Sequence, residues 1–285
     1  MLRRCLASVR ASLADHDELI VVDSASVDRD AVQRVGEEVG ALVLRCERPG
    51  VNRARNLGWS RARHDLIGWT DDDVWVDKSW ASAIVTAFDN RPSAGFIAGR
   101  TALPQGQQTT ARPVAIWDED QPIFLGPASS FLGHNANLAI RRDALVAIGG
   151  YDAELGAGAR FKSAPESDLF DRLLAHGYTG WYEPSVLAWH DQWRGSKDLF
   201  ALDWRYGVGN GARLAKLVRT DRGRAKMLIR DMVWDAGLAE VRHHLTIGSK
   251  RYVLNPVVRM AGGVAGFAWA LPTPLDDGLY RPRRR

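Results

Sequence analysis

The sequence of 285 residues predicts an α/β fold, with a mostly parallel central sheet flanked by helices and a helical C-terminal extension. Three observations support this prediction. Short β-branched runs alternate with helical patterns over the first hundred residues, which is typical of βαβ units. The hydrophobic content of 46% is enough for a sizeable core. From about residue 196 to the end the pattern is helical and basic.

The elements of the first part follow from apolar spacing and turn residues. Apolar residues three and four apart predict helices, and glycines such as Gly40 mark where they stop. Short apolar runs bounded by polar residues predict strands. The predicted helices cover 2–13, 27–40 and 77–90, a turn followed by a helix covers 48–63, and the predicted strands cover 18–23, 41–46, 65–70 and 93–100.

The rhythm changes after residue 100. Residues 101–135 are rich in Pro, Gln, Gly and Ser and predict irregular structure or short mixed strands. Further on, the sequence predicts a short helix over 141–150, an amphipathic helix over 166–178 that Gly177 ends, and short strands on either side of Pro184. The composition shift places a domain boundary between residues 195 and 196.

The charge distribution is uneven along the chain. Residues 1–200 hold 22 Lys/Arg and 27 Asp/Glu, which is −5, whereas residues 201–285 hold 16 and 7, which is +9. The second part therefore favours anionic surroundings, although its tail RPRRR also reads as a solvated end.

The two cysteines, Cys5 and Cys46, fit no disulfide framework or metal spacing, so we expect small buried residues in a reducing compartment. No signal peptide is visible, and no apolar run is long enough to span a bilayer. The nearest run, 253–271, fits either a membrane interface or the core. We expect a cytoplasmic protein, with attachment to the inner face of the membrane left open.

Three consecutive aspartates, Asp71, Asp72 and Asp73, follow directly on the apolar run 65–70. In α/β sheets ligands bind beyond the carboxyl ends of strands, and an earlier predicted strand also ends in acid, at Asp23. If the segment stays extended, Asp71 and Asp73 point to one face and Asp72 to the other. Paired carboxylates suit Mg²⁺ or Mn²⁺. Acids at the positive end of the following helix are the alternative explanation.

Six segments occur in an informative order: LRRCLASV, VVDSASVD, RPGVNRARNLG, TDDD, GHNANLAIRRDAL with GGYD after it, and ESDLFDRLLAHGY. The ordered set resembles the family-two inverting glycosyltransferases of the GT-A fold, over residues 1–200. The resemblance implies transfer of a sugar from a nucleotide-diphosphate sugar to an acceptor hydroxyl. It makes residues 1–195 the nucleotide-sugar-binding and catalytic domain and residues 196–285 a basic helical extension.

The resemblance also implies roles for individual residues, with TDDD as the family's DxD motif. A strand-end histidine bonded to the backbone is an equal alternative for His190, and a packing role is an alternative for His134. The implied residues are Asp23, Arg53, Arg55, Asp71 and Asp72 for the nucleotide sugar; Asp73, Asp71 and His190 for Mg²⁺ or Mn²⁺; and His134, Asn135 and Asn137 for the acceptor side.

The catalytic base is implied by the segment PESDLF. The family's pattern is Gly-Glu-Asp, a variable residue, then Asp or Glu followed by Leu. Aligning on the last residues puts Glu166 at the position of the base and Pro165 where the family has Glu, so this chain departs from the pattern. We name Glu166 first and Asp168 second as base. Acids favoured in the first turn of a helix are the alternative.

The resemblance implies a glycan or lipid-linked acceptor, as in cell-surface polysaccharide biosynthesis. It also implies contact of residues 196–285 with an anionic membrane surface, and self-association is left open. Nucleic-acid binding is disfavoured, because no such motif accompanies the basic charge.

A second interpretation is a catalytically inactive sugar-nucleotide-binding or scaffold protein. A fold of this kind usually begins with a strand, but this chain begins with a predicted helix. We therefore expect that the first strand is missing or is encoded upstream of Met1. The altered base segment supports the same interpretation.

Overall fold

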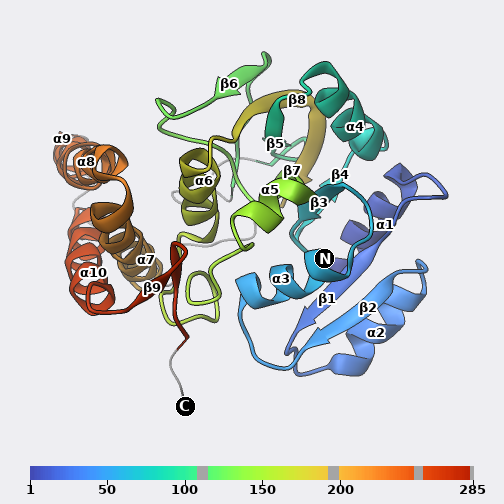
Figure 1. The fold of residues 1–285 in the computed structure, drawn as a ribbon, viewed down its shortest axis with the longest axis horizontal. Coiled ribbons are helices and arrows are strands. Elements are labelled where there is room, and N and C mark those ends of the chain that lie inside the picture. The colour runs from blue at the N-terminus through green and yellow to red at the C-terminus, as the bar shows by residue number, and fades with distance from the viewer. Residues whose placement is uncertain (108–114, 192–198, 247–252, 283–285) are drawn as a thin grey trace. The chain divides into compact units, whose positions relative to one another are not determined.

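The computed structural model describes residues 1–107, 115–191, 199–246 and 253–282 (Figure 1). The α/β class is confirmed. The chain forms two compact units and passes between them several times. The predicted boundary between 195 and 196 lies outside the described residues and stays a prediction. Unit 1 consists of residues 1–49, 53–150 and 173–195, and unit 2 of residues 50–52, 151–172 and 196–285.

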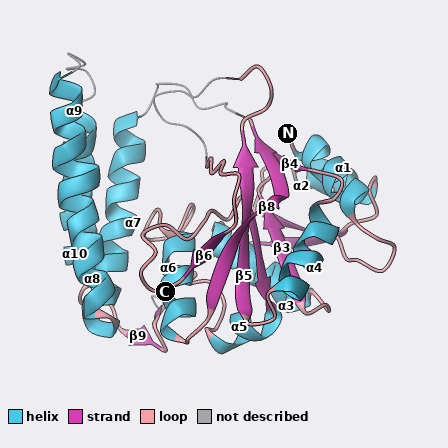
Figure 2. Cartoon of the chain, turned by 90° about the horizontal axis from the view of Figure 1, so that it is seen from above, coloured by secondary structure: helices cyan, strands magenta, loops and turns pink. Residues whose placement is uncertain are grey.

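Unit 1 is built on a mixed sheet (Figure 2), in the order β3-β7-β5-β8-β4 with β6 paired to β8. Among its described strands, β5 and β8 run parallel and the other neighbours run antiparallel. The predicted mostly parallel pairing is therefore wrong for this sheet. The strands are β3 (Leu66–Thr70), β4 (Val74–Val76), β5 (Ala94–Ala102), β6 (Ile123–Leu125), β7 (Asn137–Arg141) and β8 (Thr179–His190).

A separate parallel pair joins β1 (Ile20–Ser24) to β2 (Leu42–Cys46), and Asp23 lies opposite Arg45 in its register. The two strands predicted around Pro184 are one strand, β8. Its pairing with β5 jumps from Glu183 to Leu187, so the residues around the proline bulge out. Proline lacks the N–H that a regular ladder needs, which explains the irregularity at this place.

Helices cover the sheet of unit 1. Cys5 and Val9 of α1 pack in one core with Trp80 and Ile84 of α4 and with Ile97 of β5. These side chains are the apolar face that helical spacing predicts. The helices are α1 (Leu2–Ser12), α2 (Arg29–Glu37), α3 (Val51–Arg61), α4 (Trp80–Asn90) and α5 (Arg142–Ala147), close to the predicted ranges.

Unit 2 is mainly helical, as predicted for the C-terminal part. Helix α7 packs on α10 through glycines; an added Cβ on Gly211 would lie 2.0 Å from the carbonyl oxygen of Gly263. None of the described helices combines the length and the hydropathy that a membrane crossing needs. The elements are α6 (Pro165–Ala175, of which residues 165–172 belong to unit 2), α7 (Leu199–Thr220), α8 (Arg222–Arg230), a π-helix η1 (Asp231–Ala239), α9 (Glu240–Thr246), α10 (Leu254–Ala270), β9 (Leu275–Asp276) and β10 (Leu279–Tyr280).

Candidate active site

The three aspartates form a turn between β3 and β4. The N–H of Val74 donates to the carbonyl oxygen of Asp71 (3.2 Å), which closes the turn. The segment is therefore not extended, and a shared face of Asp71 and Asp73 stays a prediction. The chain turns because β3 and β4 pair with different neighbours, β7 and β8.

Two of the carboxylates have a basic side chain nearby. Arg55 of α3 donates to Asp71 Oδ1 (3.0 Å), and His190 Nε2 lies 3.6 Å from Asp73 Oδ1. The register of β4 and β8 sets this second contact, since Val74 pairs with His190. Desolvation, and then the charges of Asp73 and Asp71, raise the pKa of Asp72. The repulsion among the three acids is thus offset locally for Asp71, by the charge of Arg55.

Cys5 lies beneath the turn and donates from its thiol to the carbonyl oxygen of Asp71 (3.4 Å). Burial, together with the charges of Asp72, Asp71 and Asp73, raises the pKa of this thiol to about 12. Cys5 therefore stays neutral, which agrees with its expected role as a small buried residue. Cys46 is half-buried, and both cysteines are free thiols.

The pair Asp73 and His190 fits two ligands of one cation. Two ligand atoms about 2.1 Å from a metal lie roughly 3.0–3.6 Å apart at ordinary coordination angles, and Asp73 Oδ1 and His190 Nε2 are 3.6 Å apart. Nδ1 of His190 is buried and has no hydrogen-bond partner among the described residues. Within the same residues, no group of three or more His, Cys, Asp or Glu side chains could hold a metal. A cation here would need further ligands from its substrate.

His134 lies within electrostatic reach of the same site. Burial lowers its pKa to about 4, the charge of Asp71 acts against that shift, and the charge of His190 adds to it. The imidazole is therefore neutral at pH 7, and its ring lies beside that of Phe131 (centroids 4.7 Å apart). The sequence does not show that His134 is buried, so the neutral state of its imidazole could not be predicted from the sequence.

Of the two asparagines predicted on the acceptor side, the structure gives Asn137 a different role. Its amide donates to the carbonyl oxygens of Arg100 and Val186, and it accepts from Trp80 Nε1. The side chain is buried inside the sheet, so Asn137 joins strands and cannot contact an acceptor. Asn135 is also buried, and it remains a prediction for the acceptor side together with His134.

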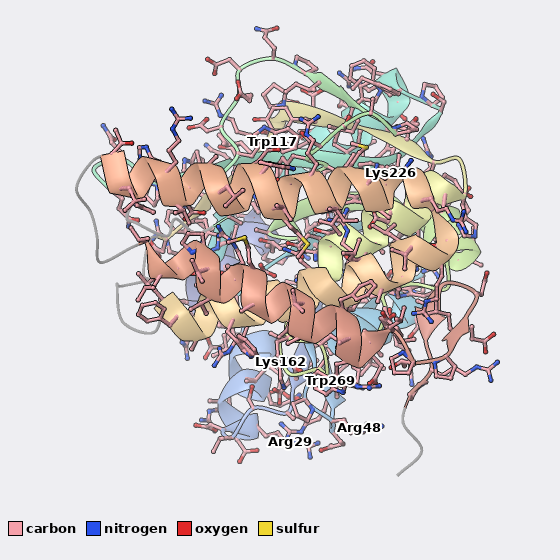
Figure 3. The ribbon with its side chains drawn as sticks, turned by 90° about the vertical axis from the view of Figure 1, so that its left-hand side faces the viewer. Arg29, Arg48, Trp117, Lys162, Lys226 and Trp269 are labelled. Atoms are coloured by element: carbon pink, nitrogen blue, oxygen red, sulfur yellow. The ribbon has the colours of Figure 1, made fainter. Side chains whose placement is uncertain are left out.

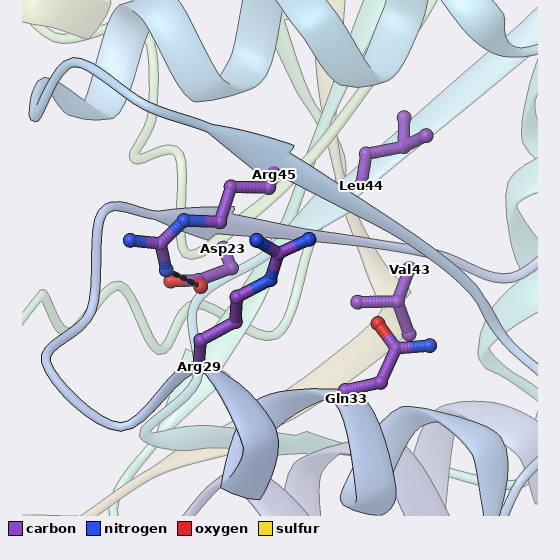
Figure 4. A pocket seen from close by; sticks show the side chains of 6 residues that line it. All are labelled: Asp23, Arg29, Gln33, Val43, Leu44 and Arg45. Atoms are coloured by element: carbon purple, nitrogen blue, oxygen red, sulfur yellow. Dashed lines mark hydrogen bonds and ion pairs between the residues drawn. The ribbon is translucent and has the colours of Figure 1, made fainter.

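Asp23 lines a small pocket at the end of β1 (Figure 4), with Arg29 and Gln33 of α2 on the other side. Its carboxylate forms an ion pair with Arg45 and accepts from the Ser26 N–H (2.8 Å). Burial raises the pKa of Asp23, but the bonds from Ser26 and Arg45 outweigh this and lower it overall. The sequence did not reveal Arg45, because its place opposite Asp23 depends on strand register. Arg53 of α3 donates to the carbonyl oxygen of Pro49 (3.4 Å).

In unit 2, the two candidate bases on α6 have different surroundings. Glu166 is half-buried in the first turn, whereas Asp168 is only 2% exposed and accepts from both Lys216 and Arg172. Burial raises the pKa of Asp168, but these two cations hold it below its ordinary value. A carboxylate in that position is a poor proton acceptor, so Asp168 is better explained as structural than as a base.

The chain enters α6 through Ala164, whose φ of +61° is in the left-handed region that favours glycine. Ala164 is the residue that aligns with the glycine of the Gly-Glu-Asp pattern. Pro165 follows at the first helical position, where its missing N–H is tolerated. The local backbone thus supports the alignment that puts Glu166 at the base position.

The sequence model described as "Glycosyl transferase family 2" matches residues 1–149. A glucosyl-dolichyl phosphate glucuronosyltransferase of Haloferax volcanii is 26% identical over 167 residues, which are 54% of this chain and 52% of the relative. A pre-mycofactocin glycosyltransferase of Mycobacterium tuberculosis is 26% identical over 222 residues, 75% of this chain and 44% of the relative. The chain spans about half the length of these curated relatives.

Solved structures show a similar fold. The mannosyltransferase PcManGT from Pyrobaculum calidifontis, solved with GDP-Man and Mn²⁺, has a TM-score of 0.62 at 17% identity, covering 93% of this chain and 82% of that one. S. aureus TarS 1-349, solved with UDP-GlcNAc, has a TM-score of 0.52 at 14% identity, covering 95% and 86%. At these identities the likeness concerns the fold alone, which is the GT-A fold.

Proposed function

This chain belongs to glycosyl transferase family 2, and from that premise we propose that it moves a hexosyl group from a nucleotide-diphosphate sugar to an acceptor hydroxyl, with inversion. The acceptor is a glycan or a lipid-linked saccharide. The observation that carries the proposal is the aspartate turn, where Asp73 and His190 face each other at a distance that suits one cation. Asp23, Arg53 and Arg55 are the residues we assign to the nucleotide.

In the proposed mechanism Glu166 removes the proton of the acceptor hydroxyl. The oxygen then attacks the anomeric carbon from the face opposite the diphosphate, which gives inversion. Glu166 is favoured over Asp168 because the latter is buried between two cations. His134 and Asn135 are the acceptor-side residues of the proposal, and the neutral His134 imidazole can both donate and accept a hydrogen bond.

Mg²⁺ or Mn²⁺ would be held by Asp73 and His190. Asp71 and Asp72 would lie close to the nucleotide sugar, and Asp71 would serve as a further ligand if it releases Arg55. A divalent cation bound there would neutralise charge on the departing diphosphate. The small number of protein ligands fits a cation whose shell the substrate completes.

The metal assignment predicts that Asp73→Ala loses at least tenfold in Mn²⁺ affinity and in sugar-nucleotide turnover, because a charged ligand is removed. Mn²⁺ binding is measured by electron paramagnetic resonance, with and without donor. Turnover is measured as nucleoside diphosphate released from GDP-mannose, UDP-GlcNAc and UDP-glucuronate. Asp89→Ala, an exposed aspartate on α4, is the control. Equal Mn²⁺ binding by both variants would sink the assignment.

Glu166→Gln tests the base. The amide keeps the shape of the side chain but cannot take a proton, so we expect donor binding within about twofold of wild type and turnover lower by about 10²-fold or more. Calorimetric titration with the nucleotide sugars measures the binding. Turnover equal to that of wild type would contradict this assignment.

The alternative function is that of an inactive sugar-nucleotide-binding or scaffold protein. The departure that favours it is the sequence Ala164–Glu166, where the family pattern has Gly-Glu-Asp. In that case wild type binds a nucleotide sugar but releases no nucleoside diphosphate, with or without Mn²⁺. The same titrations and turnover assays therefore separate the two functions.

We also propose that unit 2 rests on an anionic membrane surface. On α10 the exposed positions are all apolar: Leu254, Val257, Ala261, Val264 and Ala268 recur every three or four residues, and Trp269 and, just beyond the helix, Leu271 lie beside them. Helix α8 of the same unit exposes Arg222, Lys226 and Arg230 (Figure 3, where Lys226 and Trp269 are labelled). An apolar stripe beside basic residues suits the headgroup region of a bilayer.

Val264→Glu tests this surface, because Val264 is 72% exposed. We expect wild type to sediment with vesicles that contain phosphatidylserine, and the variant to lose most of this binding. Val85→Glu, at an exposed valine of α4, is the matched control. If wild type ignores the vesicles and elutes with the mass of a dimer, a second copy covers the stripe instead.

A further inference from the structure

Two acids on α6 face two basic residues on α7 with matching spacing. Asp168 and Asp171 are three residues apart, and so are Arg213 and Lys216. Lys216 Nζ lies 2.6 Å from Asp168 Oδ1, and Arg213 makes two bonds to Asp171 (2.5 and 2.9 Å). Residues three apart share one face of a helix, so the two helices meet through complementary charges along opposite chain directions.

Lys216 also reaches a second carboxylate. Its Nζ lies 2.6 Å from Asp152 Oδ2, in the GGYD segment that the family resemblance puts on the acceptor side. All three residues are at most 3% exposed. Lys216 therefore joins the first turns of α6 to that segment, from a position on α7 that the proposed mechanism does not use.

A buried ionic cluster of this kind fixes register better than apolar packing does. If α6 slid or turned relative to α7, a buried charge would lose its partner, whereas leucine against leucine tolerates such shifts. Arg224 of α8 adds a bond to Asp171 (2.7 Å), which resists the same motion one turn further along. Glu166 lies two residues before Asp168, so its carboxylate moves with this turn.

We infer that Lys216 is a positioning residue for sugar transfer: by binding Asp168 and Asp152 together it holds the first turn of α6, and with it the Glu166 carboxylate, in place. The inference rests on the proposed function, in which Glu166 is the base. A base must lie within hydrogen-bond reach of the proton that it takes, so a small displacement lowers turnover and leaves donor binding unaffected.

Lys216→Met is a variant that can still fold. It keeps the length of the side chain, and both carboxylates retain partners. Asp168 keeps Arg172 (3.0 Å), and Asp152 keeps the backbone N–H groups of Glu154 and Tyr280 (2.9 and 2.8 Å). Lys216→Arg restores the charge, and Lys78→Met repeats the substitution at an exposed lysine between β4 and α4.

The experiment has two readouts. One is amide hydrogen exchange at Asp168, whose N–H donates to the Ala164 carbonyl oxygen (3.2 Å) in the first turn of α6. The other is release of nucleoside diphosphate from GDP-mannose, UDP-GlcNAc and UDP-glucuronate with Mn²⁺. For Lys216→Met we expect exchange at least tenfold faster, kcat at least tenfold lower, and KM for the donor within twofold of wild type. Lys216→Arg recovers most of both, and Lys78→Met behaves as wild type.

Unchanged exchange, unchanged kcat, or a loss confined to KM in Lys216→Met overturns the inference. If Glu166→Gln turns over donor as fast as wild type, the proposed base has failed instead. If Glu166→Gln is inactive while Lys216→Met is fully active, only the positioning role has failed.

Discussion

Each of the three adjacent aspartates has its own surroundings in the turn after β3. Asp71 is bonded to Arg55 and Asp73 lies beside His190, whereas the pKa of Asp72 is raised by desolvation and by its two neighbours. A run of like charges costs free energy in folding unless something compensates it. Like charges that are held together at the end of a strand in spite of this cost are typical of functional sites.

His134 gives a pH dependence of stability that can be measured. Its pKa is about 4 in the folded chain against 6.5 ordinarily, so between these values the unfolded chain binds the extra proton. The free energy of unfolding therefore falls as pH drops from 7 to 4.5, by roughly 2 kcal/mol after allowance for partial exposure.

Urea unfolding without added metal, for wild type and His134→Gln, measures this effect. The difference in the free energy of unfolding between wild type and His134→Gln should shrink from pH 7 to pH 4.5 by the amount given for His134, because glutamine does not titrate. Parallel pH profiles of the two proteins would contradict a buried neutral imidazole.

The sequence was informative about which residues carry charge at strand ends, and less so about burial. Asp23 and Asp71–Asp73 could be chosen because they interrupt apolar runs. Asp168 and Asn137 were chosen by the same family resemblance, yet the structure buries both among hydrogen-bond partners. Whether a polar side chain faces solvent or a neighbouring element depends on contacts distant in the chain.

At the scale of elements, the helices and most strands of the first hundred residues could be predicted from the sequence, whereas β4 and β7 could not. Val74–Val76 is a strand of three residues after a turn, too short for an alternating pattern to stand out. Asn137–Arg141 is buried throughout most of its length and runs directly into α5, so its apolar run merges with a helical one. The first forms because it pairs with β8, and the second because it pairs with β5 and β3.

The contact of α7 with α10 makes a prediction about a single glycine. Alanine normally stabilises a helix by about 1 kcal/mol relative to glycine. A Cβ on Gly211, however, would lie 2.0 Å from the Gly263 carbonyl oxygen and 2.6 Å from the Phe267 nitrogen. Backbone atoms cannot rotate away, so Gly211→Ala should lower the free energy of unfolding by about 2 kcal/mol or more.

Gly223→Ala on α8 is the control, since its added Cβ would meet an Asp221 side-chain oxygen at 3.3 Å. We expect it to leave stability within about 1 kcal/mol of wild type. Thermal unfolding followed by circular dichroism gives both values. Equal midpoints for the two variants would mean that α7 and α10 are not packed through these glycines.

For the whole chain, the composition shift at 195/196 predicts one boundary, whereas the chain passes between the two units at several places. Residues 50–52 and 151–172 belong with the C-terminal helices in unit 2, although they precede the predicted boundary. Asn52 shows why, because its amide donates to the carbonyl oxygen of Asp152, 100 positions away (2.8 Å). Contacts at that separation leave no trace in local composition.

This organisation predicts that residues 1–195 do not fold as an independent domain. Without α7 and α8, Asp168 and Asp171 lose Lys216, Arg213 and Arg224. Breaking a buried ion pair costs about 3–5 kcal/mol, and a typical domain is stable by only about 5–15 kcal/mol. Two such losses, together with the exposed apolar face of α6, should remove the cooperative transition.

Calorimetry should show no cooperative unfolding transition for the fragment 1–195, and a full transition for a fragment that ends at Pro282. A cooperative transition in 1–195 would instead support a self-contained domain with its boundary at 195/196.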